Sequence, residues 1–142
     1  MIVIAADPLA VPPKERADAA FTLLTTMRPN AQDPELYFSD KPDFFHCGGN
    51  FGNVFCPFCG TDIMEWWPIG AWSKSADRRD LSVVTPCCSR ATTLNDLDYD
   101  RPQGVACVAI SLMNPESDLE PEELQQVETV LGLSVRVIWM HI

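Results

Sequence analysis

The chain has 142 residues and a formal net charge of −10, from twenty acidic against ten basic residues. Apolar residues make up 46% of it, which supports a folded domain with its own core and excludes a disordered chain. The acidic balance argues against general nucleic-acid binding, because phosphate contacts need clustered Lys and Arg. It suits a basic protein partner, although solubility alone would also account for it.

Three elements are predicted in the N-terminal third. A short aliphatic run at 2–5 predicts a strand. Residues 14–27 carry apolar side chains at spacings of three and four, which predicts an amphipathic helix that ends before Pro29. A second strand is predicted at 35–39.

The C-terminal third repeats this order of elements. Residues 104–113 are rich in Val and Ala and predict a strand, in which Cys107 would be a small buried residue. Apolar side chains at helical spacing predict a helix at 120–131, and 133–142 predicts a final strand. We therefore expect one α+β domain over 1–142, whose two strand-helix-strand halves form a single ferredoxin-like sheet.

The two halves flank a cysteine-rich stretch, residues 44–101, which we interpret as a zinc-ribbon-like insert. Its strongest signal is the motif Cys56-Pro57-Phe58-Cys59-Gly60. Two thiolates three positions apart on a tight turn can face one ion, and Gly60 supplies the positive φ that such a turn needs. A redox pair of the thioredoxin type is the alternative, but the further cysteines favour a metal, and we expect zinc.

A tetrahedral zinc needs two more ligands. Cys87 and Cys88 lie at a distance typical of a zinc ribbon's second half. Because adjacent residues in an extended chain point opposite ways, we expect one of them to bind, Cys87 with Cys88 as the alternative. Cys47 is expected as the fourth ligand, since two glycines follow it, and His46 is its neighbouring competitor. The predicted set is Cys47, Cys56, Cys59 and Cys87.

Several motifs occur together from about residue 44 to the end of the chain. They are Cys47-Gly48-Gly49-Asn50-Phe51, the Cys-Pro-x-Cys-Gly turn, Pro86-Cys87-Cys88, Leu94-Asn95-Asp96-Leu97, Leu131-Gly132-Leu133 and His141-Ile142. In this combination the chain resembles a family of uncharacterised small bacterial proteins. The resemblance implies a bacterial cytosolic origin and a structural metal, and it carries no established activity. The adjacent cysteines depart from the spaced pair of an ordinary zinc ribbon.

Catalytic and membrane functions are not expected from the remaining motifs. An all-cysteine site closes the coordination sphere, whereas a catalytic zinc keeps an open position. The chain has two histidines and shows no phosphate-binding glycine loop, nucleophile elbow or His-Glu-x-x-His pair. No apolar stretch approaches the roughly 20 residues of a membrane span, and the first apolar run is too short for a signal peptide. We expect a cytoplasmic, non-enzymatic protein with reduced thiols.

Two groups of side chains are candidate partner-binding residues. The tryptophans of the insert could anchor an interface, although the preferred reading is that they build its own small core. A run of acids near the C-terminal helix could form a negative binding face, although acids at a helix start also interact favourably with its dipole. These candidates are Trp66, Trp67, Trp72, Glu116, Asp118, Glu120, Glu122 and Glu123.

The sequence thus predicts a non-catalytic, acidic protein-binding module with a structural zinc. Its most specific form is a bacterial immunity protein that binds and neutralises a cognate toxin, such as a nuclease. The alternative is a regulatory or nucleic-acid-associated zinc ribbon that uses Lys74, Arg78 and Arg79 together with the tryptophans. A third hypothesis is a thiol-based redox protein that uses Cys88 or the pair Cys56 and Cys59.

Overall fold

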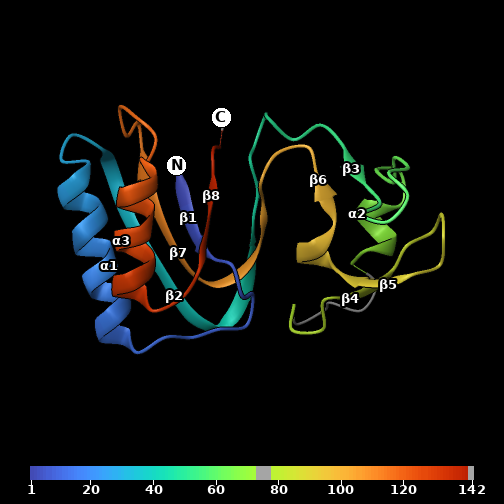
Figure 1. Cartoon of the computed structure of the whole chain (residues 1–142), viewed down its shortest axis with the longest axis horizontal. Helices are drawn as coiled ribbons and strands as arrows, with labels where there is room; N and C mark the ends of the chain where they lie inside the picture. Colours follow the sequence, from blue (N-terminus) through green and yellow to red (C-terminus); the bar gives the residue numbers. More distant parts are fainter. Residues whose placement is uncertain (73–77, 141–142) are drawn as a thin grey trace.

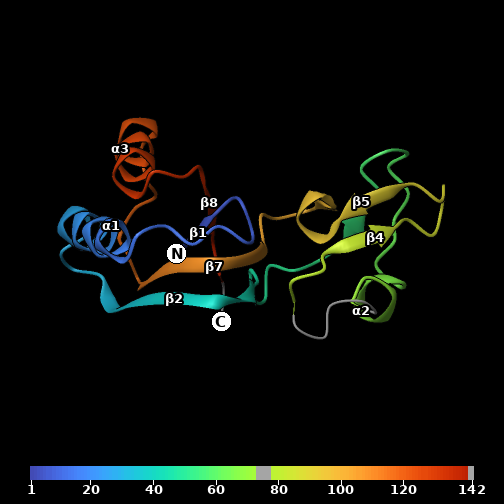
Figure 2. The ribbon, with the colours of Figure 1, turned by 90° about the horizontal axis from the view of Figure 1, so that it is seen from below.

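A computed structural model of the chain describes residues 1–72 and 78–140, which form a mixed α+β protein. Its main sheet has the strand order β2-β7-β1-β8, and every neighbouring pair is antiparallel. Figures 1 and 2 show helices α1 and α3 side by side on one face of this sheet. We call this part, residues 1–45 and 104–140, the sheet half. Its elements are β1 (Ile2–Ala5), α1 (Lys14–Met27), β2 (Gln32–Phe45), β7 (Gly104–Met113), α3 (Pro121–Leu131) and β8 (Val135–Ile138).

The core of the sheet half lies between the helices and the sheet. Leu24 of α1 and Val127 of α3 are fully buried against Val108 and Ile110 of β7, the longer of the two inner strands. Successive residues of a strand face opposite sides, so β7 also contributes to the second face of the sheet. Cys107 is buried within β7, which confirms its predicted place in the core. None of the helices in the described ranges is long and apolar enough to cross a membrane.

Strand β2 is longer than the strand predicted at 35–39. Its pairing with β7 shifts register between Gln32 and Glu35 and again between Phe38 and Asp43. Pro34 and Pro42 fall within these two intervals. Proline has no N–H to donate, and it is tolerated here because β2 is an edge strand and the irregularities interrupt the ladder.

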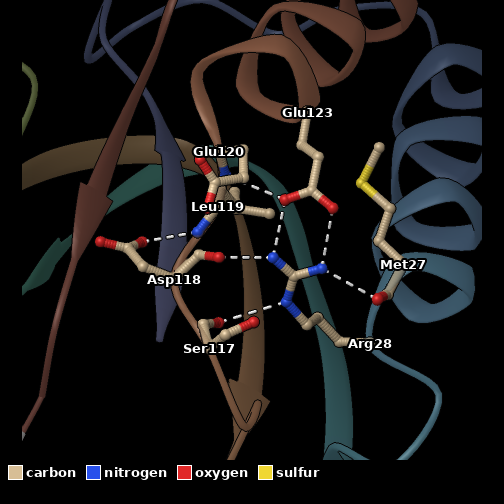
Figure 3. Close-up of polar contacts among 7 residues, drawn as sticks. All are labelled: Met27, Arg28, Ser117, Asp118, Leu119, Glu120 and Glu123. Carbon is tan, nitrogen blue, oxygen red and sulfur yellow. Dashed lines mark hydrogen bonds and ion pairs between the residues drawn. The ribbon is translucent and has the colours of Figure 1, made fainter.

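The end of α1 is tied to the start of α3 by one arginine (Figure 3). Arg28 donates two hydrogen bonds to the carboxylate of Glu123, at 3.0 and 2.7 Å, and a third from Nε to the carbonyl of Ser117 at 3.2 Å. The backbone N–H of Glu120 donates to the same carboxylate at 2.9 Å. Together these bonds lower the pKa of Glu123 to about 2, because they stabilise its ionised form.

The middle of the chain forms a second body beside the sheet half (Figure 1). We call residues 46–72 and 78–103 the cysteine lobe. The chain leaves the sheet at Phe45 and returns at Gly104, and these two residues are paired across β2 and β7. The described elements of the lobe are β3 (Val54–Phe55), α2 (Trp67–Gly70), β4 (Ser82–Val84), β5 (Ala91–Thr93), a 3₁₀ turn (Leu94–Asp96) and β6 (Asp98–Tyr99).

Polar contacts fix the lobe to the sheet half. Arg136 of β8 donates to the carbonyl of Gln103 at 2.7 Å and to that of Asn95 at 3.3 Å. The Asn95 side chain is buried and pairs with both the N–H and the carbonyl of Val105, at 2.8 and 2.9 Å. The first lobe residues add apolar contacts, since Cys47 packs with Ile4 in the cluster on the second face of the sheet. Hydrogen bonds and apolar contacts therefore hold the lobe against the sheet half.

Candidate metal centre

The motif at Cys56 folds as a tight turn directly after β3. The N–H of Gly60 donates to the carbonyl of Cys56 at 2.9 Å, and the N–H of Cys56 donates to the carbonyl of Thr61 at 2.8 Å. Gly60 has a φ of 74°, in the left-handed region that glycine adopts without steric cost. The turn therefore brings Cys56 and Cys59 to the same side, and we call residues 56–61 the first knuckle.

A second turn of the same kind connects β4 to β5. The N–H of Ser89 donates to the carbonyl of Thr85 at 3.0 Å, and the N–H of Thr85 donates to the carbonyl of Arg90 at 2.9 Å. We call residues 85–90 the second knuckle. Because Cys87 and Cys88 lie in this turn rather than in an extended strand, their side chains do not have to point to opposite sides.

The two knuckles bring four thiols together. The Sγ atoms of Cys56 and Cys88 are 3.6 Å apart, and those of Cys59 and Cys87 are 3.4 Å apart. All four Sγ atoms lie within 4.8 Å of one another. A tetrahedral zinc with Zn–S bonds of about 2.3 Å needs S···S separations of about 3.8 Å. In the described part of the chain, these four cysteines are the group that could hold a metal ion.

Neighbouring sulfurs of the group shift one another's pKa in opposite directions. Burial opposes ionisation of Cys56, but the backbone N–H groups of Cys59 and Phe58 and the neighbouring thiols lower its pKa to about 6. Thr61 lowers the pKa of Cys59 through its hydroxyl and its N–H. Desolvation and the adjacent Cys59 and Cys56 sulfurs raise the pKa of Cys87 to about 12. Four thiolates at this distance repel one another, so full ionisation requires a bound cation.

The group is buried on one side and open on the other. Cys56 is 1% exposed and Cys88 is half-buried, whereas Cys59 and Cys87 are exposed. The hydroxyls of Thr61 and Thr85 each lie 3.2 Å from a sulfur, that of Cys59 and that of Cys88 respectively. Such contacts orient the sulfurs before a metal binds.

The group of neighbouring thiols differs from the predicted ligand set at one position, because it includes Cys88 and not Cys47. Cys47 lies in the apolar cluster on the second face of the sheet, and its Sγ is 3.8 Å from Oε1 of Gln103. Burial raises the pKa of its thiol, which keeps it neutral. The competing residue His46 is exposed, and its Nδ1 accepts a hydrogen bond from the N–H of Gly48 at 3.0 Å.

The three tryptophans of the lobe are half-buried and pack against its apolar core. Trp67 lies at ring-centroid distances of 5.1 Å from Phe51 and 5.5 Å from Trp72, and its Nε1–H donates to the hydroxyl of Tyr99 at 3.2 Å. Trp66 contributes to the same cluster. Their packing agrees with the preferred reading of a small internal core, and a role in partner binding stays a prediction.

The predicted acidic face divides into two kinds of residue. Glu123 is held in the ion pair with Arg28 (Figure 3), so it has a structural role. The other four acids are exposed, and they are Glu116, Asp118, Glu120 and Glu122.

The basic cluster of the alternative hypothesis is engaged within the molecule. Arg78 forms an ion pair with Asp43, and Arg79 donates to the carbonyl of Asp40. Lys74 lies outside the described residues. These contacts direct the two arginines toward β2, where acidic side chains lower the local positive potential.

The chain was compared with protein-family models, with curated proteins and with solved structures, and none of them matches it. Among the described residues, the four-cysteine group is the feature with the most definite chemistry.

Proposed function

We propose that the four cysteines hold one structural zinc ion, and that the protein acts by binding a protein partner rather than by catalysis. The observation that carries the proposal is the convergence of four sulfurs from two turns that lie far apart in the sequence. Four thiolates suit a tetrahedral ion such as zinc or iron, and a zinc site of this kind has no open position for a substrate.

The size of the elements in the lobe supports a structural role for the metal. Strands β3 and β6 have two residues each, and β4 and β5 have three. Isolated strand pairs of this length are not stable in water, so the lobe needs a further source of stability. A structural zinc supplies folding free energy directly, because the unfolded chain has no preformed site.

The arrangement of the sheet half supports the finer description of the fold. The order β2-β7-β1-β8, with both long helices on one face, is the order expected for two ferredoxin-like strand-helix-strand halves. The pairing of Phe45 with Gly104 supports a zinc-ribbon-like insert, because the lobe begins and ends at neighbouring points of one sheet.

Metal analysis of purified protein tests the zinc site. We expect one zinc per wild-type chain and none in Cys56→Ser. Cys47→Ser is the matched control, since it also removes a buried thiol, and we expect it to keep the metal. Wild-type protein purified without chelators that contains no metal would contradict the proposal. Loss of metal in Cys47→Ser with retention in Cys56→Ser would contradict it as well.

The partner is proposed to be a basic protein, and a bacterial immunity function against a toxin is the specific form of this proposal. Four exposed acids in the loop before α3 and in its first turn, together with the net charge of −10, support electrostatic steering toward such a partner. A cavity of about 780 Å³ lies beside β1 and β7. Among the described residues that line it, Glu116 is the one with an ionisable side chain, so the cavity offers no pair of acidic and basic side chains to support catalysis.

Co-expression tests the immunity function. If a toxin gene lies beside this gene, cells that express the toxin should survive when the wild-type protein is present. Survival should fall when Glu116→Lys and Glu122→Lys are combined, because both side chains are exposed and neither belongs to the capping box of α3 or to the ion pair of Glu123 with Arg28. Failure of the wild-type protein to protect the cells, together with no complex with the purified toxin, would contradict the function.

A further inference from the structure

The two knuckles correspond residue by residue, with an offset of 29 positions, although Cys59 and Cys88 are the one pair of cysteines that coincides. The bond from Cys56 N–H to Thr61 O matches that from Thr85 N–H to Arg90 O, at 2.8 and 2.9 Å. The strand positions that flank the turns follow the same offset, since Phe55 bridges Asp62 and Val84 pairs with Ala91. Gly60 and Ser89 both have positive φ, 74° and 56°.

This correspondence places Thr85 where the first knuckle has its first ligand, Cys56. Both side chains are 1% exposed. Each approaches the same sulfur, since Cys56 Sγ is 3.6 Å and Thr85 Oγ1 is 3.2 Å from Cys88 Sγ. The γ atom of Thr85 therefore points into the thiol group. It is a hydroxyl, which can donate a hydrogen bond to a thiolate but is not among the donors that bind structural zinc.

Cys87 corresponds to Phe58, the third position of the first knuckle. Phe58 is 44% exposed, and the guanidinium of Arg90 lies 5.3 Å from its ring centre. The third position of the turn thus faces solvent in both knuckles, and in the second knuckle it carries a thiol 3.4 Å from Cys59 Sγ. The fourth sulfur of the four-cysteine group, that of Cys87, therefore comes from the solvent-facing position of the second knuckle.

We propose that Thr85 stands at a position of the second knuckle that would carry a zinc ligand, as Cys56 does in the first, but does not itself bind the metal. Cys87 supplies the missing fourth ligand in its place. This inference rests on the proposed zinc site and goes further, because it assigns a role to each position of the turn. Cys88 is the counterpart of Cys59 and binds as an ordinary second ligand. Thr85 is a positioning residue that hydrogen-bonds the Cys88 sulfur.

A thiol placed at position 85 should consequently replace the one at position 87. We expect Cys87→Ser to weaken zinc binding by more than the roughly 10- to 100-fold that the loss of an outer-shell partner costs. The double variant Thr85→Cys/Cys87→Ser should bind zinc within about 10-fold of wild type, because it restores four thiolate ligands. Thr92→Cys/Cys87→Ser is the matched control, with the same added thiol in β5, and it should stay as weak as Cys87→Ser.

Zinc affinity is measured by competition with a chromophoric chelator, and the cobalt-substituted proteins report the number of thiolate ligands by their absorption. Wild type without metal would overturn the zinc site itself. Wild type with zinc but a double variant no tighter than Cys87→Ser would overturn this inference alone. Wild-type affinity in Cys87→Ser would also overturn it, since Cys87 would then not be a ligand.

A second measurement uses the single variant Thr85→Cys, which keeps every native cysteine. With zinc bound, the thiol introduced at position 85 should displace Cys87, which is exposed and would then react with iodoacetamide. In wild type the metal should protect Cys87. Mass spectrometry of the alkylated peptides distinguishes the two thiols. Protection of Cys87 in the variant, with alkylation at position 85, would overturn the inference.

Discussion

The sheet half and the cysteine lobe reach a folded state by different means. Strand β7 of the sheet half runs for ten residues and buries Val108 and Ile110 beneath two helices. Strands in the lobe have two or three residues, and four sulfurs from its two knuckles meet at one point. The difference is the basis for our proposal that the lobe needs a bound metal ion in addition to apolar burial, whereas the sheet half does not.

The strongest test of this comparison is removal of the metal. A zinc chelator should unfold the lobe and leave the sheet half folded, since structural zinc contributes about 10 kcal/mol or more in small metal-dependent folds. Hydrogen exchange followed by mass spectrometry checks this, with loss of protection expected around Val54 and Val83 and retention at Val108. Tryptophan fluorescence should also change, because Trp67 lies in the lobe core. Simultaneous unfolding of both regions would contradict the proposal that only the lobe depends on the metal.

A core substitution tests the other side of the comparison. Leu24 is fully buried between α1 and the sheet, so Leu24→Ala should destabilise the sheet half by about 2 to 5 kcal/mol. The zinc content of the folded protein should not change. Leu9→Ala is the control, since Leu9 is 47% exposed and its truncation should cost less than about 0.5 kcal/mol. Urea unfolding with metal present measures both, and a loss of zinc in folded Leu24→Ala would contradict the separation.

The smallest expected change in stability concerns the ion pair of Arg28 and Glu123, which connects the end of α1 to the start of α3. Glu123→Gln should destabilise the sheet half by about 1 to 3 kcal/mol at pH 7, because it removes a carboxylate bonded to the part-buried Arg28. The folded-state pKa of Glu123 is about 2, below the usual value of 4.5. The stabilisation is therefore present above pH 4.5 and is lost as the pH falls toward 2.

The difference in stability between wild type and Glu123→Gln should accordingly shrink over that acidic range. Glu122→Gln is the matched control, because Glu122 is exposed at the next position of the same helix. Comparing the two variants in urea at each pH removes the contribution of acid-induced metal loss, which they share. A difference that stays constant down to pH 2 would show that the ion pair does not stabilise the sheet half.

Much of the sheet half could be predicted from local patterns. The helix predicted at 14–27 and the strand predicted at 104–113 agree with α1 and β7 at both ends. Apolar periodicity and proline positions act within a single segment, and a sequence displays them directly. The length of β2 was missed because its two prolines normally argue against a continuous strand.

The ligand set was only partly predictable, because it depends on how two distant turns face each other. Cys56 and Cys59 share a local motif, and the sequence displays it. The second knuckle has Thr85 at the position that corresponds to Cys56, and this difference hides its likeness to the first knuckle. The glycines after Cys47 indicated a turn near a site, but that segment packs on the sheet. The alignment of Thr-Pro-Cys-Cys-Ser with Cys-Pro-Phe-Cys-Gly is the signal that could have found Cys88.

The pairing of Phe45 with Gly104 has a consequence for how this chain can change over evolutionary time. A register shift of one residue in β2 or β7 would turn every side chain to the opposite face of the sheet. Because the two strands are paired up to the point where the lobe leaves and returns, residues can be gained or lost inside the lobe without moving that register. The point where the lobe leaves and returns, at Phe45 and Gly104, is thus a position at which insertions and deletions within the lobe leave the pairing of β2 and β7 unchanged.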